Sequence, residues 1–280
     1  MNSLNWSDAI LHCQHAGQGY VIATIIDAQG STPRDGGSKM VIDDAHCYDT
    51  LGGGQLEFLV TQQARELLAA NQSCQIMRPI PLAAEAAQCC GGNVLVMLEC
   101  FAKVDWQINL FGAGHVAQAL VKILAELPCQ VNVIDSRAEY LQHFNAANCR
   151  VIHHADPTQT IAEYVDNSWN IIFTHDHQLD YKLCSELLRY DRWAFVGLIG
   201  SRTKAQRFHQ RLKADGFEEQ YLTCPIGLPD VRGKRPMEVA VSIAAQLQSL
   251  YYQEQPRHKR KSTSWRTIKK LIGSNQLESY

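Results

Sequence analysis

The chain has 280 residues, of which 46% are apolar and ten are cysteine, and its formal net charge is −2. This length and apolar content suit two domains, each with its own core. A net charge near zero does not favour nucleic acid, and no apolar run is long enough for a transmembrane helix, so no membrane partner is expected. The N-terminus lacks a basic segment followed by an apolar one, and the cysteines form no C-x-x-C pair, which indicates reduced thiols in a cytoplasmic protein.

Residues 1–103 predict an N-terminal α+β domain. Apolar residues at helical spacing predict helices, and short β-branched runs bounded by turn residues predict strands. In chain order these are a helix over 4–15, a strand over 20–27, a hairpin of 38–42 and 46–49, a helix over 56–70, and strands over 74–78 and 93–100. The junction to the next domain is expected at 103–105.

Two glycine-containing loops of this domain are candidate binding sites. The three glycines at 52–54 join a strand directly to the start of a helix, where backbone amides favour an anion. A flexible linker is the alternative. Cys90 is followed by glycines at 91–92, and a thiol in an open loop suits a soft metal centre or a sulfur-bearing cofactor. Two small buried residues are the alternative there.

The segment 107–135 predicts a strand, a glycine turn, a helix, a second strand and an acid, which is the layout of a mononucleotide-binding βαβ unit. Gly112 permits the tight turn, Gly114 lets a phosphate approach the backbone, and Ala117 lets the helix lie close to the strand. Asp135 follows about 20 residues on, where a ribose-hydroxyl acceptor stands in such units. Alternatively, the same glycines only allow the strand and the helix to pack.

Strands and helices alternate through residues 104–253, which predicts a Rossmann-like, doubly wound parallel sheet with helices on both faces. Strands are expected at 107–111, 131–134, 150–153, 169–174 and 193–199, and helices at 116–127, 158–165, 181–189, 203–215 and 237–250. Ligands of such sheets bind beyond the carboxyl ends of the strands, so the following loops should converge. These loops are 112–115, 135–137, 174–177 and 200–202. Residues 254–280 are basic and poor in apolar residues, which predicts a mobile tail or a docking segment.

His175, Asp176 and His177 follow a predicted strand and are residue types that bind metals. Successive residues of a strand face opposite sides, so Asp176 would not join the two histidines, and no further Cys/His cluster completes a site. No metal site is therefore expected. General acid–base catalysis by one of the histidines remains open. A role of this loop in shaping a pocket remains open as well.

Several short stretches occur together, in a fixed order, between residues 20 and 250. They are GSTPR at 30–34, GSKM at 37–40, GGGQLE at 52–57, CGG at 90–92, FGAGHV at 111–116, THDH at 174–177, GLIGSR at 197–202 and PIGL at 225–228. As a set they resemble the xanthine dehydrogenase accessory factor family, the XdhC/CoxI type. The chain departs from that family at 51–54, where a serine-glycine-glycine-cysteine motif is common, and at Ala117, which often corresponds to glycine.

The resemblance implies a cofactor chaperone without turnover. Such proteins bind the molybdenum cofactor (molybdopterin) as cargo, protect it while a cysteine desulfurase supplies a sulfido ligand, and deliver it to a xanthine dehydrogenase-type apo-enzyme. NAD or another nucleotide is a further candidate ligand. The alternative function is an NAD-dependent oxidoreductase, because Gly112, Gly114 and Asp135 suit NAD better than NADP. A metal hydrolase using His175 and His177 is a third interpretation, and a homodimer is left open.

The expected cofactor-binding residues come from both halves of the chain, and none of them is assigned a catalytic or metal-ligating role. They are Gly52, Gly53, Gly54, Gln55, Glu57, Cys90, Gly91, Gly92, Gly112, Gly114, His115, Asp135, His175, His177, Ser201 and Arg202. Loops 52–55 and 90–92 are expected at the molybdenum end, and loop 112–115 at a phosphate or nucleotide. Glu57 either orients the pterin edge or caps the preceding loop. Both glycine loops are predicted to open toward one shared cleft.

Overall fold

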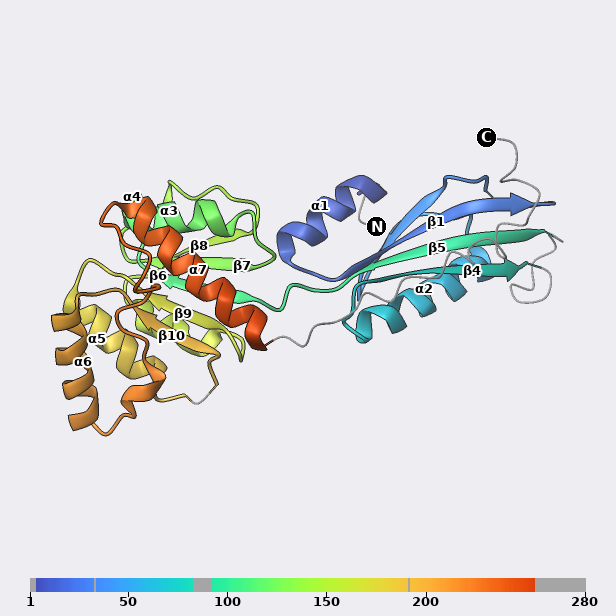
Figure 1. Ribbon diagram of the computed structural model, residues 1–280. Helices are drawn as coiled ribbons and strands as arrows, with labels where there is room; N and C mark the ends of the chain where they lie inside the picture. The colour runs from blue at the N-terminus through green and yellow to red at the C-terminus, as the bar shows by residue number, and fades with distance from the viewer. Residues whose placement is uncertain (1–3, 33, 83–91, 191, 255–280) are drawn as a thin grey trace. The chain divides into compact units, whose positions relative to one another are not determined.

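The computed structural model describes residues 4–32, 34–82, 92–190 and 192–254 (Figure 1). The chain divides into two compact units at the boundary between Lys103 and Val104. We call the part before this boundary unit 1 and the part from Val104 onward unit 2, and describe each by itself. In the described ranges, no helix is long and apolar enough to span a bilayer.

Unit 1 is a five-stranded antiparallel sheet in the order β3-β2-β1-β5-β4, with one helix against each face. Its strands are β1 (Tyr20–Gln29), β2 (Lys39–Ile42), β3 (Cys47–Asp49), β4 (Cys74–Pro81) and β5 (Asn93–Phe101), and its helices are α1 (Trp6–Ala16) and α2 (Gly54–Ala69). Residues alternate between the two faces, so Val21 and Ile25 pack with α2 while Tyr20 packs with α1. The edge strand β4 contains Pro79 and Pro81, both paired with β5.

Unit 2 is a five-stranded parallel sheet in the order β10-β9-β6-β7-β8. Its strands are β6 (Gln107–Phe111), β7 (Gln130–Asp135), β8 (Cys149–His153), β9 (Trp169–Ile172) and β10 (Phe195–Leu198). Its helices are α3 (His115–Leu124), α4 (Ala138–Leu141), η1 (Pro157–Glu163), α5 (His177–Leu187), α6 (Arg202–Ala214), η2 (Glu219–Tyr221) and α7 (Pro236–Glu254). The first strand in sequence is therefore the central one, and the chain winds outward from it in both directions, as in dinucleotide-binding folds.

Helices cover both faces of the unit 2 sheet, as Figure 1 shows for α3 and α7 on one side. Leu110 of β6 packs in the apolar cluster that includes α3 and α7, while its neighbour Phe111 packs in the cluster that includes α5 and α6. The expected fold class, an α+β domain followed by a Rossmann-like doubly wound domain, is confirmed.

Two elements of unit 2 differ from the sequence-based expectation. The segment predicted as a helix over 158–165 is the 3₁₀ helix η1, which begins at Pro157 after the cap Asp156. Its threonines lower helix propensity, and a short segment of this kind forms the tighter helix. Helix α5 begins at His177, four residues earlier than expected, because Asp176 caps it by accepting a hydrogen bond from the Gln178 amide at 2.7 Å.

A row of amide side chains crosses the buried interior of the unit 2 sheet. Asn109 of β6 lies in register with Asn132 of β7 and Asn170 of β9. Its Nδ2 donates to Asn170 Oδ1 at 2.9 Å and to Ser168 Oγ at 3.2 Å, and its Oδ1 accepts from Asn132 Nδ2 at 2.8 Å. Because buried amides are costly without partners, this row specifies which three strands lie side by side.

We predict that Asn109→Ala lowers the free energy of unfolding by about 1–3 kcal/mol, because it leaves the amides of Asn132 and Asn170 without their central partner. Urea denaturation of the full chain measures this loss. The control is Asn145→Ala at an exposed position of the same unit. Equal stability of the two variants would contradict the role assigned to the row.

Candidate functional site

The loops that follow the unit 2 strands are bonded to one another at the carboxyl edge of the sheet. The Ala113 amide, in the turn after β6, donates to Asp135 Oδ2 at 2.7 Å, and the Gly112 amide donates to Ile134 O at 2.8 Å. After β9, the Phe173 amide donates to Phe111 O at 2.9 Å. The structure therefore brings together the loops at 112–115, 135–137 and 174–177, as the alternation of elements predicts.

The two glycines of the β6 turn serve different purposes. A Cβ at Gly112 would lie 2.5 Å from Phe173 O, and the residue has a φ of 120°, so packing within the chain requires glycine there. Gly114 has an ordinary extended backbone, and a Cβ placed on it would meet no described atom within 4 Å. Neither conformation nor packing requires glycine at 114, and the space in front of the first turn of α3 is open to a ligand.

The carboxylate of Asp135, which was expected to accept a ribose hydroxyl, is already hydrogen-bonded to other residues of the chain. Its side chain is 3% exposed, and its carboxylate accepts hydrogen bonds from Ala113 and from the amide, Nε and Nη2 of Arg137 at 2.9–3.0 Å. Burial by itself raises the pKa of this carboxyl, but the hydrogen bonds from Arg137 and Ala113 outweigh burial, so the pKa lies below its ordinary value. These bonds are present at neutral pH and are lost as the pH falls through the lowered pKa. The expected preference for NAD loses its basis, because the Asp135 carboxylate is bonded within the chain.

A second buried carboxylate, which sequence reasoning missed, supports the loops after β9 and β10. Asp180 of α5 is fully buried and lies 2.6 Å from Lys204 Nζ of α6. It also accepts from the Thr174 amide at 3.0 Å, while Lys204 donates to Ile199 O at 3.0 Å. The ion pair thus holds both loops. In the sequence, this pair is signalled only by an acid, Asp180, within the apolar face of α5. Its partner Lys204 lies 24 residues further along the chain.

The predicted polar residues at this edge lie on the rim and do not form one cluster. His115, His175 and Arg202 are exposed. His177 is exposed as well, with its Nδ1 3.6 Å from Asp180 Oδ2, and Ser201 caps α6 by accepting from the Lys204 amide at 3.2 Å. In the described part of the chain, no three His, Cys, Asp or Glu side chains are arranged to hold a metal ion.

In unit 1, the glycine loop expected to bind an anion already encloses a carboxylate of the chain itself. Glu57 Oε1 accepts from the amides of Leu51 at 2.9 Å and Gly53 at 2.7 Å, and from the Thr50 hydroxyl. The Gly52 amide donates to Thr50 Oγ1 at 3.0 Å. Within the expected anion cradle at 52–54, the Gly53 amide is thus already engaged by Glu57 and the Gly52 amide by Thr50. Of the two roles left open for Glu57, the structure supports loop capping.

The residues at the start of β5 have a packing role. A Cβ at Gly92 would lie 2.6 Å from the carbonyl oxygens of Gln29 and Ser31, so the chain passes too close to them for a side chain. Gly92 O accepts from the Leu82 amide at 2.9 Å. The expected contacts of Cys90 and Gly91 lie outside the described residues. Gly54 and Gln55 begin α2 at exposed positions.

Burial makes several of the described thiols weaker acids. All eight described cysteines are free, and burial raises the pKa of several of them. The raised values are about 11 for Cys13, Cys100, Cys149 and Cys224, and about 12 for Cys129. A thiol with a raised pKa is a poor nucleophile at neutral pH, so these cysteines serve as packing residues.

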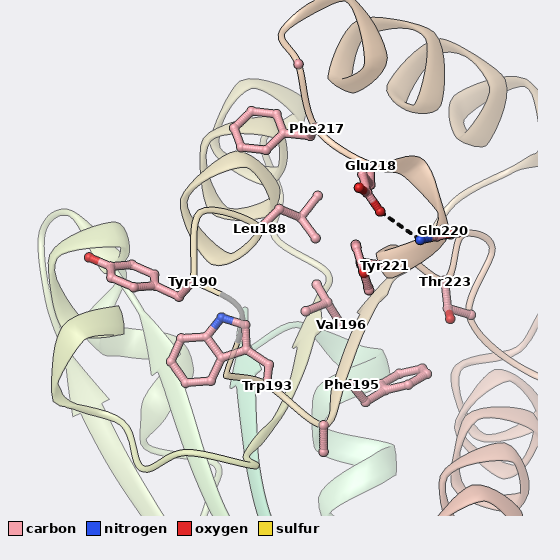
Figure 2. A pocket seen from close by; sticks show the side chains of 12 residues that line it. Leu188, Tyr190, Trp193, Phe195, Val196, Phe217, Glu218, Gln220, Tyr221 and Thr223 are labelled. Carbon is pink, nitrogen blue, oxygen red and sulfur yellow. Dashed lines mark hydrogen bonds between the residues drawn. The ribbon is translucent and has the colours of Figure 1, made fainter.

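A cavity of about 450 Å³ lies elsewhere in unit 2 and contains no predicted site residue. Figure 2 shows Trp193 and Phe195, at the start of β10, on one side and Phe217 and Tyr221 on the other. Its polar groups include Glu218, whose carboxylate accepts from Gln220 Nε2 at 2.7 Å. Sequence reasoning missed it because these residues surround the beginning of an edge strand, away from the edge at which such folds bind ligands.

The strand order, the glycine turn and the open first turn of α3 define unit 2 as a Rossmann-type domain, preceded here by an α+β unit. The family model for the XdhC Rossmann domain matches residues 108–247, and that for the XdhC and CoxI family matches residues 13–78. The chain therefore belongs to the XdhC family.

The individual proteins that this chain resembles have low sequence identity to it. The chain is 26% identical over 234 residues to "Uncharacterized protein YqeB" of Escherichia coli (strain K12), covering 81% of this chain and 43% of that protein. The chain therefore spans less than half the length of this relative. A crystal structure described as a xanthine dehydrogenase from Bacillus halodurans has 21% identity and a TM-score of 0.48, over 93% of this chain and 98% of that one. ChuY from E. coli CFT073 has 14% identity and a TM-score of 0.32, over 56% and 94%.

We predict that Glu57→Ala lowers the free energy of unfolding by about 1–3 kcal/mol, because the amides of Leu51 and Gly53 lose their shared acceptor. Glu57→Gln keeps an acceptor oxygen and should lose less. Urea denaturation measures both, with Glu66→Ala, at an exposed position of the same helix, as the control. If Glu57→Ala matched the control, the carboxylate would not hold the loop.

We predict that Lys204→Met destabilises the chain by about 3–5 kcal/mol, because it leaves the charge of Asp180 buried without its partner. The double variant Asp180→Leu with Lys204→Met should recover part of this loss, since no lone charge remains. Urea denaturation of both variants measures the difference. A double variant less stable than Lys204→Met alone would show that the ion pair is not the main contribution.

Proposed function

We propose that this chain binds the molybdenum cofactor, protects it while its sulfido ligand is installed, and delivers it to a xanthine dehydrogenase-type apo-enzyme. It acts as a carrier without turnover. Two observations support this: the family matches lie in both units, and the open space at Gly114 has no explanation within the chain. The same proposal includes a cysteine desulfurase as the sulfur donor and a cytoplasmic location, and it leaves a homodimer open.

The residues of unit 2 fit the phosphate of such a cargo. The pterin of the molybdenum cofactor carries a phosphate and two dithiolene sulfurs, and the complete cofactor would supply a metal–oxo centre that can receive sulfur. Gly114 allows a phosphate oxygen to approach the backbone, and the first amides of α3, beginning at His115, favour its negative charge. Exposed donors on the neighbouring loops, from His175, His177 and Arg202, complete the proposed phosphate end.

Two of the expected ligand contacts are reassigned. The Glu57 carboxylate accepts a hydrogen bond from the Gly53 amide, and the Asp135 carboxylate accepts one from the Ala113 amide. We therefore propose both acids as positioning residues that give the glycine turns their shape. Loops 52–55 and 90–92 remain our proposal for the molybdenum end, where the thiol of Cys90 suits a soft ligand. A cleft shared by both glycine loops stays a prediction.

The alternative, an NAD-dependent oxidoreductase, is weakened by one contact. The acid that would accept the ribose hydroxyls is bonded to Arg137 and Ala113. A titration with NADH, followed by its fluorescence, separates the two functions. Tight NADH binding by protein that does not retain molybdopterin would favour the oxidoreductase.

We predict that Gly114→Val lowers the affinity for molybdopterin by at least about tenfold, because the new side chain fills the phosphate approach and costs more than about 1.4 kcal/mol. The thermal midpoint should fall only slightly, because valine is a poorer N-cap than glycine but a Cβ at this position would meet no described atom within 4 Å. The measurement is the oxidised pterin released per chain after loading. Ala214→Val, at the exposed end of α6, is the control of matched size. Unchanged retention of molybdopterin in Gly114→Val would show that the phosphate does not bind at this turn.

We also predict that Cys90→Ala weakens retention of the molybdenum cofactor while leaving retention of metal-free molybdopterin less affected, because a thiol would interact with the metal end. The same pterin-release measurement is run on both loaded forms. Cys47→Ala, which changes an exposed cysteine of unit 1, is the control. Equal losses for both cysteines would exclude a specific role for Cys90.

A further inference from the structure

The end of β7 presents a cation where a dinucleotide-binding unit usually presents an acid. Both carboxylate oxygens of Asp135 are engaged by the Arg137 side chain, at 3.0 Å from Nε and 2.9 Å from Nη2. Asp135 is 3% exposed, whereas the Arg137 side chain is 24% exposed. A ligand that reaches this position therefore meets the guanidinium before it meets the carboxylate.

The guanidinium of Arg137 is held in one orientation, and its Nη1 remains available as a donor. The central carbon of the guanidinium lies 4.0 Å from the centre of the Tyr140 ring. This contact and the two hydrogen bonds to Asp135 together fix the plane of the guanidinium. Over the described ranges, no residue accepts a hydrogen bond from Nη1 of Arg137. A pre-oriented guanidinium with a free N–H edge is the side chain best suited to phosphate oxygens.

Besides Asp135, the described neighbours of this guanidinium include one histidine and one acid. Ser136 lies between Asp135 and Arg137, and its carbonyl oxygen is 3.1 Å from Nε2 of His153 at the end of β8. One exposed acid, Glu139, interacts with Arg137 and opposes an incoming anion, but solvent screens its charge. The N–H groups of Arg137 Nη1, which no described residue engages, can be donated to a phosphate without breaking the bonds to Asp135, whereas a neutral diol would gain no charged contact.

We infer that Arg137 makes unit 2 selective for a nucleotide whose ribose carries a phosphomonoester over the same nucleotide with free ribose hydroxyls. The first turn of α3 takes the phosphates that join the two halves of such a ligand, and Arg137 binds the additional phosphate. Hydroxyls in that place would have to displace the guanidinium from Asp135. The nucleotide and the proposed cofactor cargo would compete for the first turn of α3, but the inference does not depend on the cargo, because nucleotide binding is measured without molybdopterin.

The first test compares NADPH with NADH as probes of the full chain, by fluorescence titration at one ionic strength. We expect NADPH to bind at least about tenfold more tightly, as the additional charged contact predicts. Equal affinities, tighter binding of NADH, or no binding of either nucleotide at millimolar concentration would each overturn the inference. Retention of molybdopterin in a separate measurement decides the cargo proposal independently.

The second test assigns the selectivity to one side chain. Arg137→Leu should reduce NADPH affinity at least about tenfold and leave NADH affinity equal or improved, because Asp135 becomes available to the hydroxyls. Arg137→Lys keeps the charge without the planar fork and should be intermediate. Arg189→Leu, at an exposed position after α5, is the control and should change neither affinity. Unchanged preference in Arg137→Leu, with the fold verified by circular dichroism, would overturn the assignment.

The third test separates a ribose phosphate from any other phosphate. 2′,5′-ADP should displace NADPH better than 5′-ADP, since only the former carries the phosphomonoester on the ribose. Inorganic phosphate at equal concentration should displace little. If inorganic phosphate competes as well as 2′,5′-ADP, the site binds a free anion and the inference is wrong.

Discussion

The hydrogen bond from the Ala113 amide to the Asp135 carboxylate is the contact on which the ligand-facing edge of unit 2 depends. It joins the turn after β6 to the end of β7 and fixes the direction in which the first turn of α3 points. Without it, the amide at the centre of the glycine turn would be free to bind a ligand directly. With it, the chain itself supplies one negative charge, and the ligand must find its donors elsewhere on the rim.

The same arrangement recurs at two other loops. Asp180 holds the loops after β9 and β10 through Thr174 and Lys204, and Glu57 holds the glycine loop before α2. In each case a carboxylate oxygen accepts hydrogen bonds from backbone amides. The exposed side chains at the carboxyl edge of unit 2 include histidines and an arginine as well as the acid Asp176. The proposed phosphorylated cargo would bind through the donors among them.

Much of the fold could be predicted from local pattern. The apolar runs, glycine turn and following acid placed β6, α3 and β7 correctly, because each depends on residues close together in sequence. The roles of the acids could not be predicted in the same way. Whether Asp135 faces a ligand or Arg137 depends on side-chain orientation, and both arrangements have the same sequence pattern. The pair Asp180–Lys204 joins two helices, and the asparagine row joins three strands, so neither is visible within one element.

The prolines of β4 have a consequence for how unit 1 can associate. Pro79 and Pro81 stand two positions apart on the edge of the sheet, and proline has no amide hydrogen to donate. Another chain that tried to extend the sheet along this part of β4 would find two successive donors missing. Growth by strand addition is thereby discouraged at this border, as it is in many proteins that expose an unpaired edge. If copies of this chain pair in solution, symmetric contact between side-chain surfaces is a better arrangement than a continuous sheet through the second half of β4.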